Sequence, residues 1–156
     1  MNQNPASTRP AYLDDPHAFE GVLSRRVLAS VIDLGSIILL VMVLGTLFTV
    51  LTLGLGLLLI WALPFTALIA IAYVAMTVGS PAQATWGMRL MGVRMERTDG
   101  GRVDALLAAI HALVYWGSVT IATPLVLLIG LFTDRRRLLH DIVLGIVVVR
   151  SDTQLR

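Results

Sequence analysis

Long uncharged stretches dominate the hydropathy pattern of this chain. Between Leu34 and Met88 there is no Asp, Glu, Lys, Arg or His. A helix needs about 20 predominantly apolar residues to cross a bilayer, so this stretch and the few residues before it supply two crossings and a turn. Glycine is the helix breaker available in so leucine-rich a segment, and Leu53-Gly54-Leu55-Gly56 is therefore the expected turn. We predict membrane spans over about 27–51 and 57–79.

A third apolar block, residues 105–132, is interrupted only by His111 and is followed by three arginines at 135–137. One helix of that length would cross the membrane, whereas two crossings would have only about 14 residues each, too few for full spans. A re-entrant or strongly tilted hairpin, broken near Thr123-Pro124, is the alternative, because proline loosens a helix. A short apolar stretch over 138–149 follows this block.

The distribution of arginine orients the chain in the membrane. Arginines occur in the N-terminal tail, in the connector over 82–104 and in the C-terminal part, and the turn between the first two spans has none. By the positive-inside rule, the N-terminus and the connector are cytoplasmic. Three plain crossings would place the C-terminal arginines outside, whereas a hairpin in the third block would return them to the cytoplasm. Both topologies stay open.

Polar segments flank the membrane domain, which we place at 25–150. Residues 1–24 carry three prolines and an acidic pair, and this composition predicts a partly disordered cytoplasmic tail that buries no core. Residues 151–156 form a polar C-terminal tail. Within the arginine-bearing connector, residues 90–96 fit either an amphipathic surface stretch or a short strand.

Composition supports a membrane protein and argues against several other classes. The chain is 56% hydrophobic and only 14% charged, against about 25% charged residues in ordinary soluble domains. The absence of cysteine excludes disulfides, zinc ribbons and thiol catalysis. The net charge of +2 gives no reason to expect a nucleic-acid partner, and no phosphate-binding glycine loop is present. We therefore predict an all-α protein of the bacterial cytoplasmic membrane, with the lipid bilayer as its main partner.

Asp33 is an ionisable residue within the first predicted span. It lies seven residues after Arg26, two helical turns deeper and about 10 Å further along the axis. Helical side chains lean toward the N-terminus, so Arg26 is poorly aimed at Asp33 and another partner is expected. A buried aspartate costs about 2.5–3.5 kcal/mol at the centre of a bilayer. It is either a structural contact that locks helices together or a proton or cation site.

Polar side chains also recur at helical spacing in the second and third apolar blocks. Such stripes are typical of seams between helices in lipid, and a polar path is the alternative interpretation. No second histidine at i+4 from His111 and no carboxylate cluster indicates a metal site. His140 and Asp141 are adjacent in sequence without a nucleophile elbow, so they do not indicate a hydrolase. We expect no enzyme activity and no cofactor. The two stripes are Thr66, Ala70, Tyr73 and Thr77, and His111, Tyr115 and Ser118.

Three segments together resemble the RDD family of small membrane proteins. The resemblance covers about residues 22–150, and the arginine and two aspartates for which the family is named correspond to Arg26, Asp33 and Asp141, with Arg25 as a rival for the first. The segments are Arg26-Val-Leu-Ala29-Ser-Val-Ile32-Asp33, Thr85-Trp-Gly87-Met-Arg89-Leu-Met-Gly92-Val-Arg94 followed by Asp99-Gly100, and Arg137-Leu-Leu-His140-Asp141-Ile-Val-Leu-Gly145.

The resemblance implies a role in transport, although this chain departs from the family pattern at Trp86, Met88 and His111. Transport of an ion or small solute by a homo-oligomer, with Asp33 as the proton or cation site, is the leading hypothesis. The alternative is a non-catalytic scaffold or assembly factor in which the arginine and aspartates are structural. The expected partners of Asp33 are Arg89 or Arg94 from the connector, or His111, and His140 is a further supporting residue.

Overall fold

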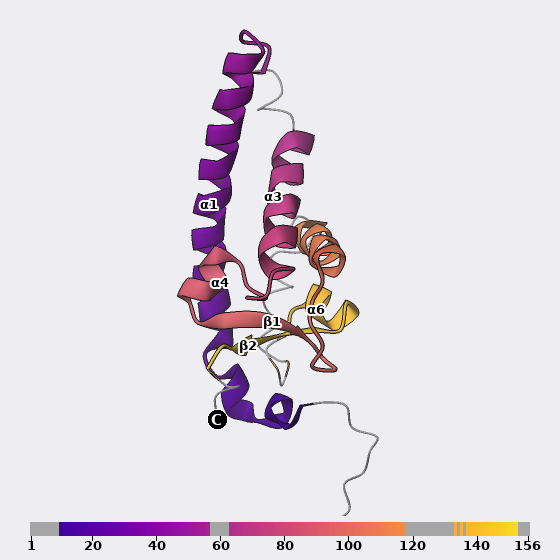
Figure 1. Ribbon diagram of the computed structural model, residues 1–156. Coiled ribbons are helices and arrows are strands. Elements are labelled where there is room, and N and C mark those ends of the chain that lie inside the picture. Colours follow the sequence, from indigo (N-terminus) through magenta and orange to yellow (C-terminus); the bar gives the residue numbers. More distant parts are fainter. Residues whose placement is uncertain (1–9, 57–62, 118–132, 134, 136, 153–156) are drawn as a thin grey trace, which may run out of the picture.

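A computed structural model describes residues 10–56, 63–117, 133, 135 and 137–152. Two apolar helices, α1 (Val22–Leu51) and α3 (Leu63–Val78), rise side by side from a smaller assembly at their base (Figure 1). With 30 residues, α1 is about 45 Å long, enough to cross a bilayer. It ends at Leu51 with Thr52 as its C-cap, directly before the predicted turn, in which Gly54 has a φ of +98°.

Helices α1 and α3 form a hairpin, and its surface is apolar where a soluble protein would be polar. Among the described residues, one segment, Pro16–Leu51, is long and apolar enough to cross a membrane, and only 11% of its most apolar window is buried inside the protein. Large apolar side chains such as Val31, Leu39 and Met42 are more than 60% exposed. Lipid is the solvent that fits such a surface. The second predicted span, 57–79, is described only from Leu63 onward, as the 16 residues of α3, so the described residues support one full span.

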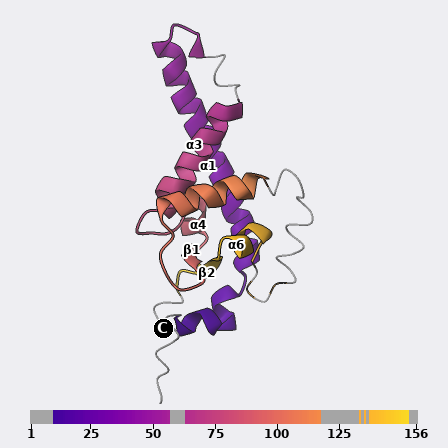
Figure 2. The same cartoon turned by 90° about the vertical axis from the view of Figure 1, so that its right-hand side faces the viewer.

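A third apolar helix, Ala105–Gly117, lies crosswise to the hairpin (Figure 2). Its inner face is buried at Ala108 and His111, whereas Leu106 and Leu113 on its outer face are 71% and 60% exposed. The described part of the predicted third block therefore runs across α1 and α3 and not beside them. The rest of that block, including Thr123-Pro124, lies outside the described residues.

The base contains a two-stranded antiparallel sheet, so the expectation of an all-α fold is wrong in this respect. Strand β1 (Val93–Arg97) pairs with β2 (Ile146–Arg150), with Met95 opposite Val148. One of the two interpretations of residues 90–96, a short strand, is thus confirmed. A one-turn helix precedes each strand: α4 (Trp86–Leu90) before β1 and α6 (Leu139–Val143) before β2.

Strand β2 is buried on both of its faces, which explains its continuous run of β-branched residues. Ile146 and Val148 point into one core, shared with the start of α1, the end of α3 and α4. Val147 and Val149 point into a second core on the opposite face of the sheet. Side chains alternate along a strand, so four consecutive apolar residues are needed to fill two cores.

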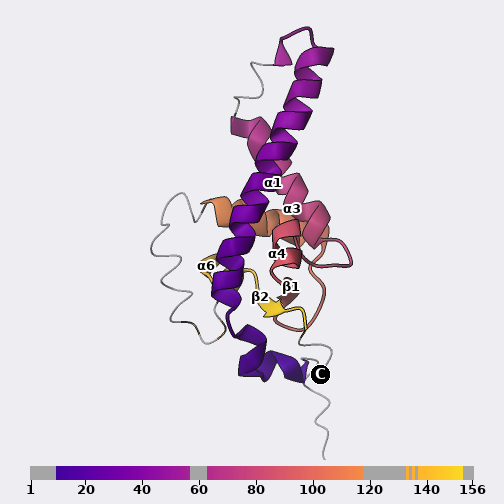
Figure 3. The same ribbon diagram turned by 90° about the vertical axis from the view of Figure 1, so that its left-hand side faces the viewer.

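The second core is completed by the N-terminal segment. Two short 3-10 helices, η1 (Ala11–Asp14) and η2 (Pro16–Phe19), lie at the foot of α1 beneath the sheet (Figure 3). Leu13 and Phe19 are 1% and 5% exposed and contact the second core. The expectation that residues 1–24 bury no core is therefore wrong for residues 11–19. Pro10 and Pro16, two of the three prolines that suggested disorder, begin these helices, since Pro10 is the N-cap of η1 and Pro16 occupies the first position of η2.

Candidate functional site: the carboxyl groups of Asp33 and Asp141

Asp33 is bonded to three neutral donors from two other segments. Its Oδ1 accepts hydrogen bonds from the Tyr73 hydroxyl (2.7 Å) and the Gly87 backbone N–H (2.8 Å). Its Oδ2 accepts a hydrogen bond from the Thr85 hydroxyl (2.6 Å). Tyr73 belongs to α3, whereas Thr85 and Gly87 lie at the start of α4. Asp33 therefore joins α1 to both of these helices.

The sequence around α4 is shaped for this contact. Thr85 is the N-cap of α4 and also accepts a hydrogen bond from the Met88 N–H (3.2 Å), as capping threonines do. Gly87 must lack a side chain, because a Cβ there would lie 2.2 Å from the Ala29 carbonyl oxygen. This close approach brings the N–H groups at the start of α4 within reach of Asp33. The Thr-Trp-Gly segment thus builds an acceptor site for one carboxyl group.

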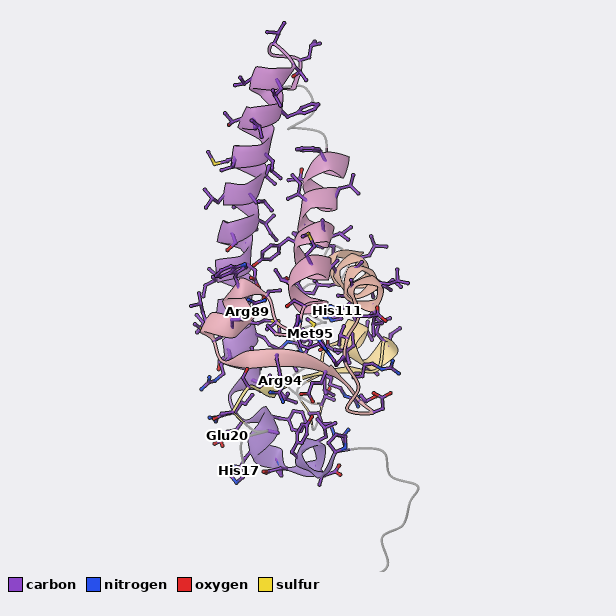
Figure 4. The ribbon with its side chains drawn as sticks, viewed as in Figure 1. His17, Glu20, Arg89, Arg94, Met95 and His111 are labelled. Carbon is purple, nitrogen blue, oxygen red and sulfur yellow. The ribbon has the colours of Figure 1, made fainter. Side chains whose placement is uncertain are left out.

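The cationic partners expected for Asp33 are bonded elsewhere, and that expectation is wrong. Arg89 donates from Nε to the Ala84 carbonyl (3.1 Å). Arg94 forms an ion pair with Glu96 (2.6 Å) on the same strand. Figure 4 shows Arg89 on α4, Arg94 on β1 and His111 on the crosswise helix, at three separate places in the base. Neutral donors take the position that the sequence argument assigned to a cation.

Asp141 is the second aspartate of the family motif, and unlike the half-buried Asp33 it has charged and titratable partners. Its Oδ2 accepts hydrogen bonds from Arg26 Nη1 (2.5 Å) and from the Leu138 backbone N–H (2.9 Å). Its Oδ1 lies 2.9 Å from His111 Nε2 and 3.4 Å from His140 Nε2. The side chain of Asp141 is fully buried. Residues from α1, the crosswise helix and α6 therefore meet at one carboxyl group.

The two histidine rings pack edge to face beside this carboxyl group. The ring centroids of His111 and His140 are 4.8 Å apart, and Tyr115 packs edge-on to His140 at 5.2 Å. His111 and His140 are 4% and 1% exposed. Although neighbours on a helix usually point apart, Asp141 folds back to cap the start of α6. This conformation brings its Oδ1 near His140.

The electrostatics of the cluster favour an ionised Asp141 and a neutral His140. Burial alone would raise the pKa of the Asp141 carboxyl, but the Arg26 guanidinium and the His111 hydrogen bond outweigh it and hold the pKa below its usual range. Burial lowers the pKa of His140 to about 4, against the opposing effect of the Asp141 charge. At neutral pH the cluster holds one arginine–carboxylate ion pair beside an uncharged imidazole.

The structure thus separates the predicted site residues into two groups. Arg26, His111, His140 and Asp141 come together, and Asp33 forms a different site. The rival Arg25 donates to the Met91 carbonyl (2.7 Å), so Arg26 is the arginine paired with a motif aspartate. Sequence reasoning did not assign Tyr73, Thr85 and Gly87 to Asp33. The signal available was the Thr-x-Gly pattern of a capped helix start, which offers a hydroxyl and free N–H groups to an acceptor.

These features define a helical, membrane-type protein with a buried arginine–aspartate pair that joins the two ends of one domain. The chain belongs to the RDD family, whose model matches residues 21–145 and so includes Arg26, Asp33 and Asp141. The family resemblance of the three sequence segments is confirmed. Neither a curated protein nor a solved structure matches this chain.

Proposed function

We propose that this protein transports a cation across the bacterial cytoplasmic membrane, and that the cation binds at Asp141. The observation that carries the proposal is the fully buried Asp141 carboxylate, which faces Arg26 on one oxygen and two histidines on the other. Buried carboxylates with several converging partners often mark binding sites, because such sites use burial and specific neighbours to set the charge of their ionisable groups.

The position of Arg26 suggests how binding couples to movement. A buried carboxylate requires a compensating cation, and Arg26 fills that role from the first turns of α1. A transported cation that binds the other oxygen of Asp141 weakens the attraction between this carboxylate and Arg26, because the two cations then share one negative charge. Occupancy of the site therefore biases the packing of α1 against α6, and α1 is the helix long enough to cross the membrane.

Asp33 has a structural role in this proposal and is no longer the cation site. Three donors already occupy its oxygens, and all three come from neutral groups. A cation would have to displace contacts that hold α1, α3 and α4 together. The hypothesis of a cation site at a motif aspartate is kept for the protein, but the site is moved from Asp33 on α1 to Asp141 in the base.

The test is flux in liposomes that contain the purified full chain. A panel of proton, alkali-metal and divalent-metal gradients is applied to wild type and to Asp141→Asn. We expect flux for at least one cation in wild type and its loss in the variant. Equal flux in both proteins for every gradient, or no flux in wild type, would overturn the proposal.

A scaffold or assembly role is the second candidate, and the internal pairing of Arg26, Asp33 and Asp141 favours it. Each of these side chains bonds to a segment far away in the sequence, as expected for residues that hold a fold together. In that case the protein would need no enzyme activity and no ion path. A stable partner that co-purifies from native membranes, together with absent flux, would select this role.

We also propose that the transporting form is a homo-oligomer, since one hairpin encloses too little volume for a solvated path. The expected seam on the second span is occupied within the chain, because Ala70 and Tyr73 are 3% and 9% exposed and Tyr73 bonds Asp33. A contact between copies must therefore use other surfaces. Cross-linking in native membranes that yields only monomer would contradict the proposed homo-oligomer.

A further inference from the structure

Two of the three histidines in the chain meet at Asp141, although 29 positions separate them in sequence. One ligand atom each from His111, His140 and Asp141 lies within 4.8 Å of the others. Two of the separations are 2.9 and 3.4 Å, from Asp141 Oδ1 to His111 Nε2 and to His140 Nε2. All three side chains are buried. Three converging donors are the usual protein contribution to a four-coordinate metal ion that keeps one open position.

These distances are close to what a tetrahedral ion requires. Zinc binds histidine nitrogen and carboxylate oxygen at about 2.0–2.1 Å, which places neighbouring ligand atoms about 3.4 Å apart. The His140–Asp141 distance has this value, and the His111–Asp141 distance is half an ångström shorter. Binding needs a small opening of the His111 hydrogen bond and an approach of the two imidazoles. No backbone rearrangement is implied by these shifts.

Arg26 supports the carboxylate and does not block it. The guanidinium bonds Oδ2, whereas both histidines face Oδ1. The two oxygens can therefore serve Arg26 and an ion at the same time, with Arg26 acting as an outer partner that orients the ligand. The backbone N–H of Leu138 fixes the carboxylate further through Oδ2.

The donor set indicates which ions fit. Two imidazoles and one carboxylate suit zinc and its first-row neighbours, whereas calcium and magnesium prefer sites built only from oxygen. We propose that His111, His140 and Asp141 bind zinc or a neighbouring divalent metal ion of the first row, such as cobalt, and that this ion is the transported cation. The assignment as cargo rests on the proposed transport function, but binding does not. A metal ion needs the lone pair of His111 Nε2, so in the bound state this neutral imidazole carries its hydrogen on Nδ1 and Nε2 binds the ion in place of its hydrogen bond to Asp141.

The test measures binding of Zn²⁺ and Co²⁺ to the detergent-solubilised full chain, prepared without a histidine tag and stripped with a chelator. We expect one ion per chain and, for Co²⁺, the intense visible absorption of a four-coordinate site. His111→Gln and His140→Gln should each weaken binding at least tenfold. His17 is the matched control, because it lies in η2 and its side chain is 81% exposed. His17→Gln should bind as wild type does.

A second measurement on the wild-type protein guards against variants that fail to fold. With ¹⁵N-labelled histidine, only three imidazoles contribute to the spectrum. Zn²⁺ should shift two of them, and the third, assigned with His17→Gln, should stay in place. Absence of stoichiometric binding, or an unchanged position of either His111 or His140, would overturn the site. Metal binding without flux of any ion would support the metal site but exclude the metal as the transported cation. Flux of another cation without metal binding would support transport but exclude the metal site.

Discussion

Replacing Arg26 by methionine removes the cation from a carboxylate that has no access to solvent. The Asp141 side chain is fully buried and the Arg26 side chain is 11% exposed, so water can compensate little of the loss. Removal of one member of a buried ion pair typically costs about 3–5 kcal/mol, because the remaining charge is unpaired. The His111 contact and the Leu138 N–H remain, which places Arg26→Met toward the lower end, at about 3 kcal/mol.

Arg25→Met is the matched control, since it removes a neighbouring arginine of the same helix turn. Arg25 donates one hydrogen bond to a backbone carbonyl, and its loss should cost about 1 kcal/mol. The assay is reversible unfolding in mixed detergent micelles, followed by helicity, with the wild-type chain as reference. Arg26→Met should lower the free energy of unfolding by about 2 kcal/mol more than Arg25→Met does.

A double variant separates an unpaired charge from lost packing. If the cost of Arg26→Met comes from the unpaired Asp141 charge, adding Asp141→Asn should recover part of it, giving a coupling free energy of at least about 1 kcal/mol. Equal destabilisation by the two arginine variants, or strictly additive effects of Arg26→Met and Asp141→Asn, would refute the reasoning.

Four further results are expected. Asp33→Ala should destabilise the protein by about 3 kcal/mol. Asp33→Asn should cost only about 1 kcal/mol, because the amide keeps one acceptor oxygen. Equal destabilisation by the two variants would contradict the hydrogen bonds described for Asp33. Gly87→Ala should cost about 1–3 kcal/mol through the clash with the Ala29 carbonyl, whereas Gly35→Ala, with open space around it, should be tolerated. In the presence of a metal chelator, the free energy of unfolding should fall by at most about 3 kcal/mol as the pH drops from about 6.5 to 4. His140 binds a proton over this range in the unfolded chain, whereas in the folded protein it is buried, with its pKa near 4, and does not. His140→Gln should make the free energy of unfolding less dependent on pH. A reporter fused after Arg156 should be cytoplasmic if the third block is re-entrant. A reporter accessible from outside would exclude the re-entrant hairpin and support three plain spans.

The hairpin was predictable because its signals are local. A charge-free run long enough to cross a membrane and a glycine-rich turn within it specify α1 and its end without reference to the rest of the chain. The three family segments likewise identified Arg26, Asp33 and Asp141. Their pairing was not predictable from local spacing, because Arg26 and Asp141 lie 115 positions apart.

The features that sequence reasoning missed are non-local. A short strand over 90–96 was one of the two open interpretations, whereas β2 and its pairing with β1 were not expected. The two strands are short and far apart in sequence, and the apolar run of β2 resembles a piece of a membrane helix. The second histidine does not stand at i+4 from His111, where a local ligand pattern would have it, because the fold supplies it from α6. The cationic partner predicted for Asp33 follows only if an acid within an apolar helix needs an opposite charge. The structure shows that a hydroxyl pair and one helix N–H can serve instead.

The central claim is that the two aspartates have different roles, with Asp141 binding the cation and Asp33 holding the helices together. The most direct measurement is cation flux per folded molecule for Asp33→Asn and Asp141→Asn, reconstituted in parallel after both are shown to be monodisperse and helical. The account predicts near wild-type flux for Asp33→Asn and loss of flux for Asp141→Asn. Loss of flux in Asp33→Asn with normal flux in Asp141→Asn would contradict it.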